Sequence, residues 1–274
     1  LKQEADAKIQ RSLVRTQLWI IDKLRRFNYQ FNDFVAKDAD FKKRLMAMFE
    51  PSLTVPDYSA LDGRKDLSYR YEFRYTSFIQ REEEIYRLWD FLTGESERKF
   101  TWWMVTGPGG IGKSRLALEF CLLARLANWY AGVLEQRQIA GFSWSQWDPQ
   151  RKTLIVIENA GSQLDLVKNL IGELSRRPMQ DRPLDVPVRL LLLEREIDEE
   201  KLKNLVSDPA IALGSFSTGK LPELLELPPF DQEHLWKIIV EVHLKEGKSL
   251  PANKDEILED LYRIDPEMRP LFAF

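Results

Sequence analysis

The sequence is poor in residues that form disulfides or bind metals, with one cysteine and two histidines among its 274 residues. Cys121 has no second cysteine in this chain to pair with, which suits a reducing compartment such as the cytosol. His234 and His243 do not share a helical turn, so they do not predict a paired metal site. No apolar run is long enough to span a membrane, and no signal peptide is visible. We therefore expect a cytoplasmic protein without membrane contact.

An excess of positive charge is also lacking. The 40 Lys and Arg residues are balanced by 43 Asp and Glu residues, for a formal net charge of -3. This balance argues against a broad nucleic-acid surface, so we expect no direct nucleic-acid binding. The hydrophobic content of 44% indicates a globular protein. Because the chain begins with Leu1 and ends inside the apolar stretch 271–274, we expect a fragment of a longer protein.

The most specific motif is Gly107–Ser114, which reads Gly-Pro-Gly-Gly-Ile-Gly-Lys-Ser and fits the phosphate-binding loop G-x-x-x-x-G-K-[ST]. Residues 100–106 before it are aromatic and β-branched, which predicts a buried strand. Residues 114–125 after it have apolar residues at helical spacing. A strand, a glycine-rich loop and a helix therefore follow one another in the order that this motif requires.

The composition of the loop has a physical reason. Glycines permit backbone angles that let successive N–H groups point inward around an anion, and the start of the next helix adds its positive dipole end. Lys113 would reach the β- and γ-phosphates, and Ser114 would hold Mg²⁺. We expect ATP or ADP to bind here with Mg²⁺, through Gly107, Gly109, Gly110, Ile111, Gly112, Lys113, Ser114 and Arg115.

Two further apolar runs predict strands that end beside this loop. Residues 153–157 are followed by Glu158-Asn159, where a carboxylate could organise Mg²⁺ and its water shell. An amide such as Asn159 cannot accept a proton at neutral pH, so slow or absent hydrolysis is a hypothesis. Residues 188–193 lead to Glu194-Arg195-Glu196, where Arg195 could pair with a neighbouring glutamate.

Strands alternate with helices, which predicts an α/β fold of the P-loop NTPase type, a parallel sheet with helices on both faces. The alternating residues 69–75 predict a short extra strand, and residues 206–220 a loop. We divide the chain into a helical N-terminal segment that links or self-associates, a linker, a nucleotide-binding domain and the start of a helical lid, at residues 1–50, 51–67, 68–229 and 230–274.

The stretch Phe-Ile-Gln-Arg-Glu-Glu-Glu-Ile, at residues 78–85, followed by a helix and then the phosphate loop, resembles the STAND ATPases, relatives of NB-ARC and NACHT proteins. The resemblance implies that the backbone of Phe78 and Ile79 contacts adenine and that Arg81 approaches the nucleotide. It also implies that Arg195 senses the γ-phosphate and that Pro270 packs near the nucleotide. Gln80 and Met268 stand where the family usually has glycine.

The resemblance further implies a regulatory switch. In that family ADP holds a closed form, and exchange for ATP permits homo-oligomerisation. Bacterial members include antiviral sensors whose C-terminal region recognises a protein trigger. We expect a weak ATPase in which Lys113, Glu158 and Arg195 serve catalysis. An AAA+-type motor or loader, with faster hydrolysis, is the alternative. A P-loop kinase would need an acceptor site and an Arg-rich lid, and neither is visible in the sequence.

Overall fold

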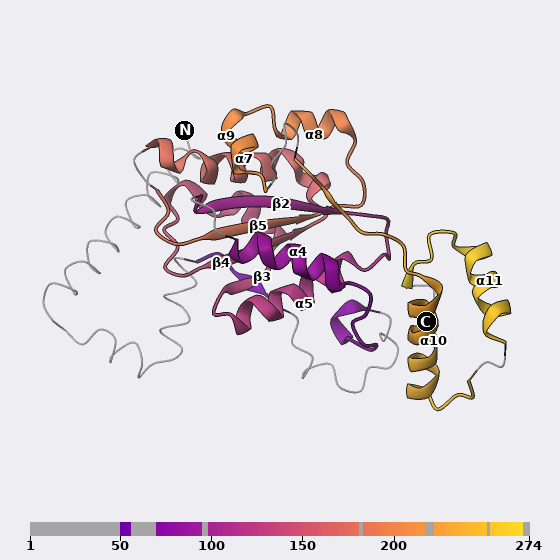
Figure 1. Cartoon of the computed structure of the whole chain (residues 1–274). Coiled ribbons are helices and arrows are strands. Elements are labelled where there is room, and N and C mark those ends of the chain that lie inside the picture. Colours follow the sequence, from indigo (N-terminus) through magenta and orange to yellow (C-terminus); the bar gives the residue numbers. More distant parts are fainter. Residues whose placement is uncertain are drawn as a thin grey trace, which may run out of the picture. The chain divides into compact units, whose positions relative to one another are not determined.

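The computed structural model describes residues 50–55, 70–94, 98–180, 183–216, 222–250 and 253–270 (Figure 1). All of these except Glu50 belong to one compact unit, Pro51–Phe274. The helical segment predicted for residues 1–50 and most of the predicted linker lie outside the described residues. None of the described helices is both long enough and apolar enough to cross a bilayer.

Among the described residues, six strands form one sheet in the order β1-β3-β4-β5-β2-β6. All neighbouring pairs are parallel except β1 with β3. The strand that leads into the phosphate loop is β2, and β5 separates it from β4. The strands are β1 (Leu53–Thr54), β2 (Phe100–Thr106), β3 (Tyr130–Leu134), β4 (Thr153–Glu158), β5 (Val188–Leu193) and β6 (Leu225–Glu226).

Helices cover both faces of this sheet (Figure 1). Trp102 and Met104 of β2 pack with α7, α8 and α9, whereas Trp103 and Val105 pack with α4 and α5. Because both faces are covered, the central strands are continuous apolar runs rather than alternating ones. The predicted α/β sheet is therefore confirmed. The helices are α4 (Glu82–Thr93), α5 (Lys113–Leu126), α6 (Gln136–Gly141), α7 (Leu164–Ser175), α8 (Glu199–Leu205) and α9 (Pro209–Gly214).

The strand predicted over residues 69–75 is wrong in its described part. Tyr71–Phe73 form a short 3-10 helix, η3, which ends at Arg74 in the left-handed conformation with φ 47°. The edge of β3 that an extra strand could have joined is paired with β1 instead, from within the predicted linker. Tyr71–Phe73 therefore lie near α5 as a 3-10 helix rather than pairing as a strand.

The loop predicted over residues 206–220 is also wrong, because it contains α9. The side chain of Asp208 accepts a hydrogen bond from the Ala210 N–H at 2.8 Å, which caps the helix. Pro209 occupies the first helical turn, where its missing N–H has no cost. An Asp-Pro pair ahead of apolar residues is thus a helix-start signal that was overlooked.

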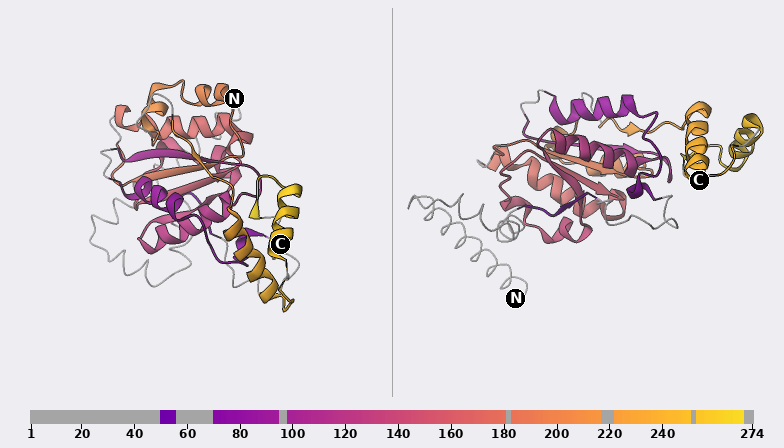
Figure 2. Two further views of the ribbon diagram at one scale, coloured as in Figure 1. Left: turned by 45° about the vertical axis from the view of Figure 1, so that its right-hand side comes forward. Right: turned by 90° about the horizontal axis from the view of Figure 1, so that it is seen from below.

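A pair of helices, α10 (Gln232–Lys245) and α11 (Lys254–Ile264), lies beside the sheet and its covering helices (Figure 2). Asp231 caps α10 as predicted, since its side chain accepts from the His234 N–H at 2.8 Å. The pair has a small apolar core of its own, which includes Leu235, Ile239 and Leu258. We refer to residues 230–270 as the lid.

Candidate functional site

The phosphate loop connects β2 to α5 with an irregular backbone. Gly107, Gly110 and Gly112 have φ angles of 148°, 85° and 103°, a region that side chains rarely adopt. The Gly107 N–H donates to the Arg195 carbonyl at 3.1 Å. Ile111 is fully buried and anchors the loop in the core. Gly107 and Ile111 therefore fix the loop to the protein, whereas Gly109, Gly110 and Gly112 are partly exposed.

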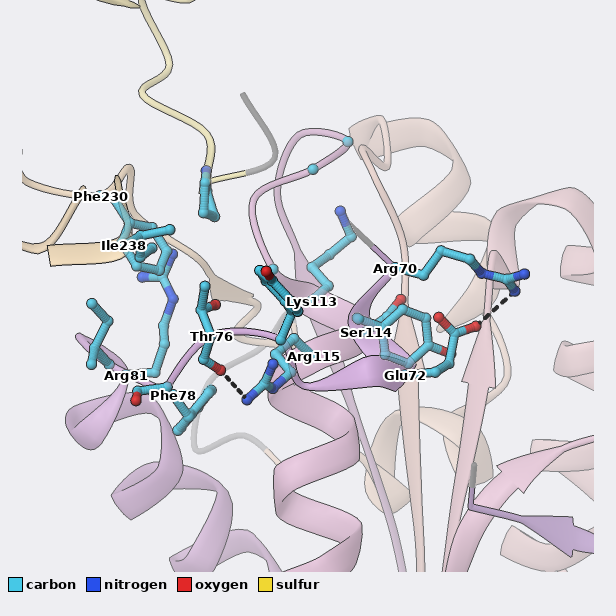
Figure 3. Close-up of a pocket in the computed structure, with 18 of the residues that line it drawn as sticks. Arg70, Glu72, Thr76, Phe78, Arg81, Lys113, Ser114, Arg115, Phe230 and Ile238 are labelled. Carbon is cyan, nitrogen blue, oxygen red and sulfur yellow. Dashed lines mark hydrogen bonds and ion pairs between the residues drawn. The ribbon is translucent and has the colours of Figure 1, made fainter. Parts of the chain in front are cut away.

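A cavity of about 460 Å³ lies beside this loop (Figure 3). One of its walls is the loop and the start of α5, and the others come from residues 70–81 and from the lid. Of the site residues predicted from the sequence, the cavity is lined by Phe78, Ile79, Arg81, Gly109, Gly110, Gly112, Lys113, Ser114, Arg115, Arg195 and Pro270. The predicted residues Gly107, Ile111 and Glu158 are not part of the lining.

Lys113 carries a positive charge at this wall without an acidic partner among the described residues. Its ammonium group donates to the carbonyl oxygens of Gly107 and Pro108, the latter at 2.9 Å. Burial lowers the pKa of Lys113, and the nearby charge of Arg195 lowers it further, whereas Glu194 opposes the shift. A half-buried cation held beside another cation favours binding of an anion.

Arg195 follows β5 and lies beside the phosphate loop. Its side chain is exposed, lies beside Gly109 and forms no ion pair with the described residues. The alternative reading, a salt bridge with Glu194 or Glu196, is therefore not observed there. Glu194 instead accepts hydrogen bonds from the backbone N–H groups of Gly161 and Arg195. Its carboxylate braces the turn after β4.

Arg81 lines the cavity and is also bonded to the surrounding protein. Its side chain is 2% exposed and donates to Glu84 and to the carbonyls of Ile111 and Pro228, at 2.9 Å for Pro228. It also stacks on Phe230, 4.4 Å from the ring centroid. Burial lowers its pKa, and Glu84 partly offsets this. Arg81 thus ties the phosphate loop to the start of the lid, while its buried Nε atom has no hydrogen-bond partner in the described chain.

Arg115 lines the cavity but is engaged by the protein. Its Nε donates to Glu119 at 2.9 Å, and its Nη2 donates to the Thr76 carbonyl at 3.0 Å. Figure 3 shows the bond to Thr76 as a dashed line. Glu119 also receives a bidentate contact from Arg74, at 2.7 and 2.8 Å. Arg115 therefore positions the cavity wall, and any contact with a nucleotide stays a prediction.

Gln80 and Met268 both adopt left-handed backbone, with φ angles of 54° and 48°. These are the positions where the STAND pattern has glycine, the residue for which this conformation has no steric cost. The Gln80 side chain accepts from the Asp231 N–H at 2.9 Å, which binds it to the start of α10.

Arg269 is a site residue that the sequence reasoning did not single out. Its guanidinium donates to the Gly109 carbonyl of the phosphate loop at 3.3 Å. Asp265 holds it there, accepting from the Arg269 backbone N–H at 2.7 Å and from its Nε at 3.0 Å. Asp265 and Arg269 follow α11 rather than lying within it, so no helical spacing singles out this pair in the sequence. The lid thus contacts the loop directly.

The far end of the cavity is apolar and comes from the chain ahead of α4 and from the lid (Figure 3). It is lined by Tyr75, Phe78, Ile79, Phe230 and Ile238. In the described chain, the backbone N–H and C=O groups of Phe78 and Ile79 have no hydrogen-bond partner. An apolar slot bordered by free backbone donors and acceptors suits a flat heteroaromatic ring.

Oxygen donors for a divalent cation are few. Ser114 lines the cavity beside Lys113, and its hydroxyl has no hydrogen bond to the described residues. Glu158 ends β4 and is half-buried outside the lining, whereas Asn159 follows it and faces the cavity with φ 52°. Within the described ranges no cluster of acids, histidines or cysteines could hold a metal alone. This fits Mg²⁺, which keeps several waters and takes further oxygens from phosphates.

No protein-family model matches the sequence, and no curated protein matches it. Solved structures do. The Walker-type ATPase PABY2304 of Pyrococcus abyssi has 14% identity over 72% of this chain and 65% of its own, with a TM-score of 0.46. The Aeropyrum pernix ORC2 protein, in ADPNP–ADP complexes, has 13% identity over 77% of this chain and 64% of its own, with a TM-score of 0.52.

Cdc6p from Pyrobaculum aerophilum has 13% identity over 76% of this chain and 63% of its own, with a TM-score of 0.49. This chain therefore spans less than two thirds of each of these structures. Sequence identities this low support only a shared fold. The likeness to ORC2, which has the highest TM-score of the three, supports that fold best. Together with the strand order and the loop between β2 and α5, it establishes that the chain has the P-loop NTPase α/β fold.

Proposed function

We propose that the cavity binds ATP and ADP, with the phosphates on the loop at Gly109–Ser114 and the base in the apolar slot. The observation that carries this is the pair Lys113 and Arg195. Lys113 belongs to the phosphate loop and Arg195 lies beside it. Neither forms an ion pair with the described residues. A polyphosphate would supply the missing negative charge, and the loop amides would receive its oxygens.

The base would be recognised by backbone groups. Adenine presents a donor and an acceptor on one edge, and Phe78 and Ile79 offer free backbone acceptors and donors beside apolar side chains. Arg81 would shape this end of the site through the Ile111 and Pro228 carbonyls rather than by touching the phosphates.

Ser114 would hold Mg²⁺ directly, and Glu158 would act through the water shell, because it lies outside the lining. The ion would neutralise charge on the phosphates. Hydrolysis is expected to be slow, since Asn159 faces the cavity where a general base would be useful and the Glu194 carboxylate is engaged by backbone N–H groups.

We infer that the module serves as a STAND-type regulatory switch in a longer, cytoplasmic signalling or defence protein, in which nucleotide exchange controls homo-oligomerisation. The left-handed backbone at Gln80 and Met268 supports this assignment. A nucleotide at a hundred times its Kd stabilises the state that it binds by about 2.7 kcal/mol. Inverting a 1:99 population takes about 5.5 kcal/mol, so a second input, such as a protein trigger recognised outside this chain, would be needed.

The second candidate is an AAA+-type motor or loader, which the likeness to the ORC2 fold favours. Such an enzyme would hydrolyse ATP faster and would use an arginine from a neighbouring subunit. Steady-state turnover separates the two readings. The switch predicts nucleotide retained through purification and weak turnover, whereas the motor predicts turnover that rises with added DNA or protein.

Calorimetric titration with ATP and ADP tests the binding proposal. Lys113→Ala removes the cation beside the loop and should abolish measurable binding of both nucleotides. Lys168→Ala is a matched control, because Lys168 is a half-buried lysine that bonds Asn204 and Ser207 and does not line the cavity. Equal affinities for the Lys113 variant and the parent protein would overturn the proposal.

A further inference from the structure

The segment Arg74–Gln80, which we call the strap, forms the wall of the cavity that carries Phe78 and Ile79. Both of its ends have left-handed backbone, at Arg74 with φ 47° and at Gln80 with φ 54°. Between these two bends the chain is neither helix nor strand. Its position must therefore come from contacts with neighbouring elements rather than from secondary structure of its own.

The α5 side holds the first half of the strap. Arg74 makes its bidentate contact with Glu119, and Arg115 donates to the Thr76 carbonyl at 3.0 Å. Because Arg115 also bonds Glu119 at 2.9 Å, these groups form one charged network on α5. The strap is thereby fixed to the helix that begins at the phosphate loop.

The lid holds the strap from the other side. Glu241 of α10 accepts from the Ser77 N–H at 2.8 Å and from its hydroxyl at 3.2 Å. Lys245, one turn later, bonds Glu241 at 2.9 Å, donates to the Tyr75 carbonyl and lies 5.4 Å from the centre of the Tyr75 ring. The Asp231 N–H donates to the Gln80 side chain at 2.9 Å.

We propose that Glu241 is a positioning residue for base recognition, through which the lid sets the backbone of Phe78 and Ile79. The inference rests on the proposed nucleotide site. Glu241 does not line the cavity, and its carboxylate contacts Ser77, the residue directly before Phe78. Hydrogen bonds from a backbone N–H to a carboxylate are among the stronger ones in proteins. A base in the slot and a closed lid therefore stabilise each other, which links occupancy of the base site to the lid.

This geometry separates the base from the phosphates. The phosphate loop is held by Ile111, by Arg195 and Arg81, and by Arg269 of the lid. None of these four residues bonds Glu241. Removing Glu241 should weaken a ligand that has a base and spare one that has only phosphates. A substitution in the loop should have a different effect, since Lys113→Ala should lower the affinity for both ligands. A merely structural role for Glu241 would also weaken both ligands.

Calorimetric titrations with ATP and with inorganic tripolyphosphate, on the full chain of 274 residues, test this inference. Glu241→Ala should lower the affinity for ATP by about tenfold, equivalent to about 1.4 kcal/mol, and leave that for tripolyphosphate unchanged. Glu241→Gln keeps an acceptor for the Ser77 N–H and should recover part of the loss. Glu259→Ala removes an exposed acid from α11 and should change neither affinity.

Lys245→Ala gives a second route, because it removes the contact with the Tyr75 carbonyl and should show the same split between the two ligands. Thermal melting checks that each variant is folded. Equal weakening of both ligands by Glu241→Ala, or no weakening of either, would overturn the role of Glu241. A parent protein that bound neither ligand would overturn the proposed nucleotide site itself, so the two failures are distinguishable.

Discussion

The guanidinium of Arg195 lies against the backbone of Gly109, with its Cζ atom 3.4 Å from the point where a Cβ at Gly109 would sit. The carbonyl oxygen of Gly109 also accepts a hydrogen bond from Arg269 of the lid, at 3.3 Å. Arginines from the end of β5 and from the lid thus meet at one glycine of the phosphate loop. What this loop binds should therefore affect both the sheet domain and the lid.

Arg195→Ala should weaken the binding of ATP more than the binding of ADP. The guanidinium has no ion-pair partner in the described chain, lies beside Gly109 and is close enough to Lys113 to lower the pKa of Lys113, so we propose that it contacts the γ-phosphate. A charge-assisted hydrogen bond is worth about 2 kcal/mol, so the ATP affinity should fall by more than about tenfold while the ADP affinity is unchanged. Calorimetric titration measures both affinities. Equal losses for both nucleotides, or none, would contradict a role in sensing the γ-phosphate.

Gly112→Ala and Gly109→Ala form a matched pair that tests the loop backbone. Gly112 has φ 103° and open space around it, so alanine would be strained there by about 1–2 kcal/mol. Gly109 lacks a positive φ, and its neighbour is the movable end of the Arg195 side chain. Urea unfolding of the ligand-free protein should show destabilisation by Gly112→Ala and little change with Gly109→Ala. The reverse order would refute this backbone argument.

The sequence predicted the α/β sheet well because its signals are local. β2, β4 and β5 are apolar runs buried on both faces, and the glycine spacing located the turn between β2 and α5. What it missed depends on distant contacts. Nothing near residues 53–54 indicates pairing with β3, because that strand is defined by its partner.

The site was predictable where a motif fixes the backbone and less so where side chains choose their partners. Lys113, Ser114 and Arg195, three of the predicted site residues, line one cavity. Arg81 and Arg115 line the same cavity, but their hydrogen bonds go to carbonyls of Ile111, Pro228 and Thr76. Such pairings require the lid and the strap to be in place, and residue types at given spacings do not specify them.

Gln80→Ala and Gln80→Gly should differ although both remove the same side chain. Each loses the hydrogen bond from the Asp231 N–H, worth about 1 kcal/mol. Glycine also relieves the strain of φ 54°, which offsets most of that loss, whereas alanine keeps it. The free energy of unfolding, measured in urea, should fall by about 1 kcal/mol for alanine and by less than half of that for glycine. Glycine as harmful as alanine would show that the left-handed backbone carries no strain.

Asp265→Asn should destabilise the protein at neutral pH and lose this effect in acid. Burial alone would raise the pKa of Asp265, but hydrogen bonds and charge from Arg269 outweigh it and hold the pKa below its ordinary value of 3.8. A carboxyl whose pKa is lower in the folded state stabilises that state above the ordinary pKa, and the stabilisation disappears as the pH falls through the folded-state value. Bonds to a buried charge are worth about 2 kcal/mol, which sets the expected difference at pH 7.

Urea unfolding of Asp265→Asn and the parent protein, repeated from pH 7 down to below 3.8, measures this difference. Asp260→Asn is the matched control, because Asp260 pairs with Arg263 on the surface with 57% of its side chain exposed and should contribute little. The gap between Asp265→Asn and the parent should narrow only below the ordinary carboxyl pKa. If this difference in the free energy of unfolding stayed constant with pH, the contact between Asp265 and Arg269 would stabilise the protein through packing rather than through charge. The hydrogen bond from Arg269 to the Gly109 carbonyl would then not depend on the ionisation of Asp265.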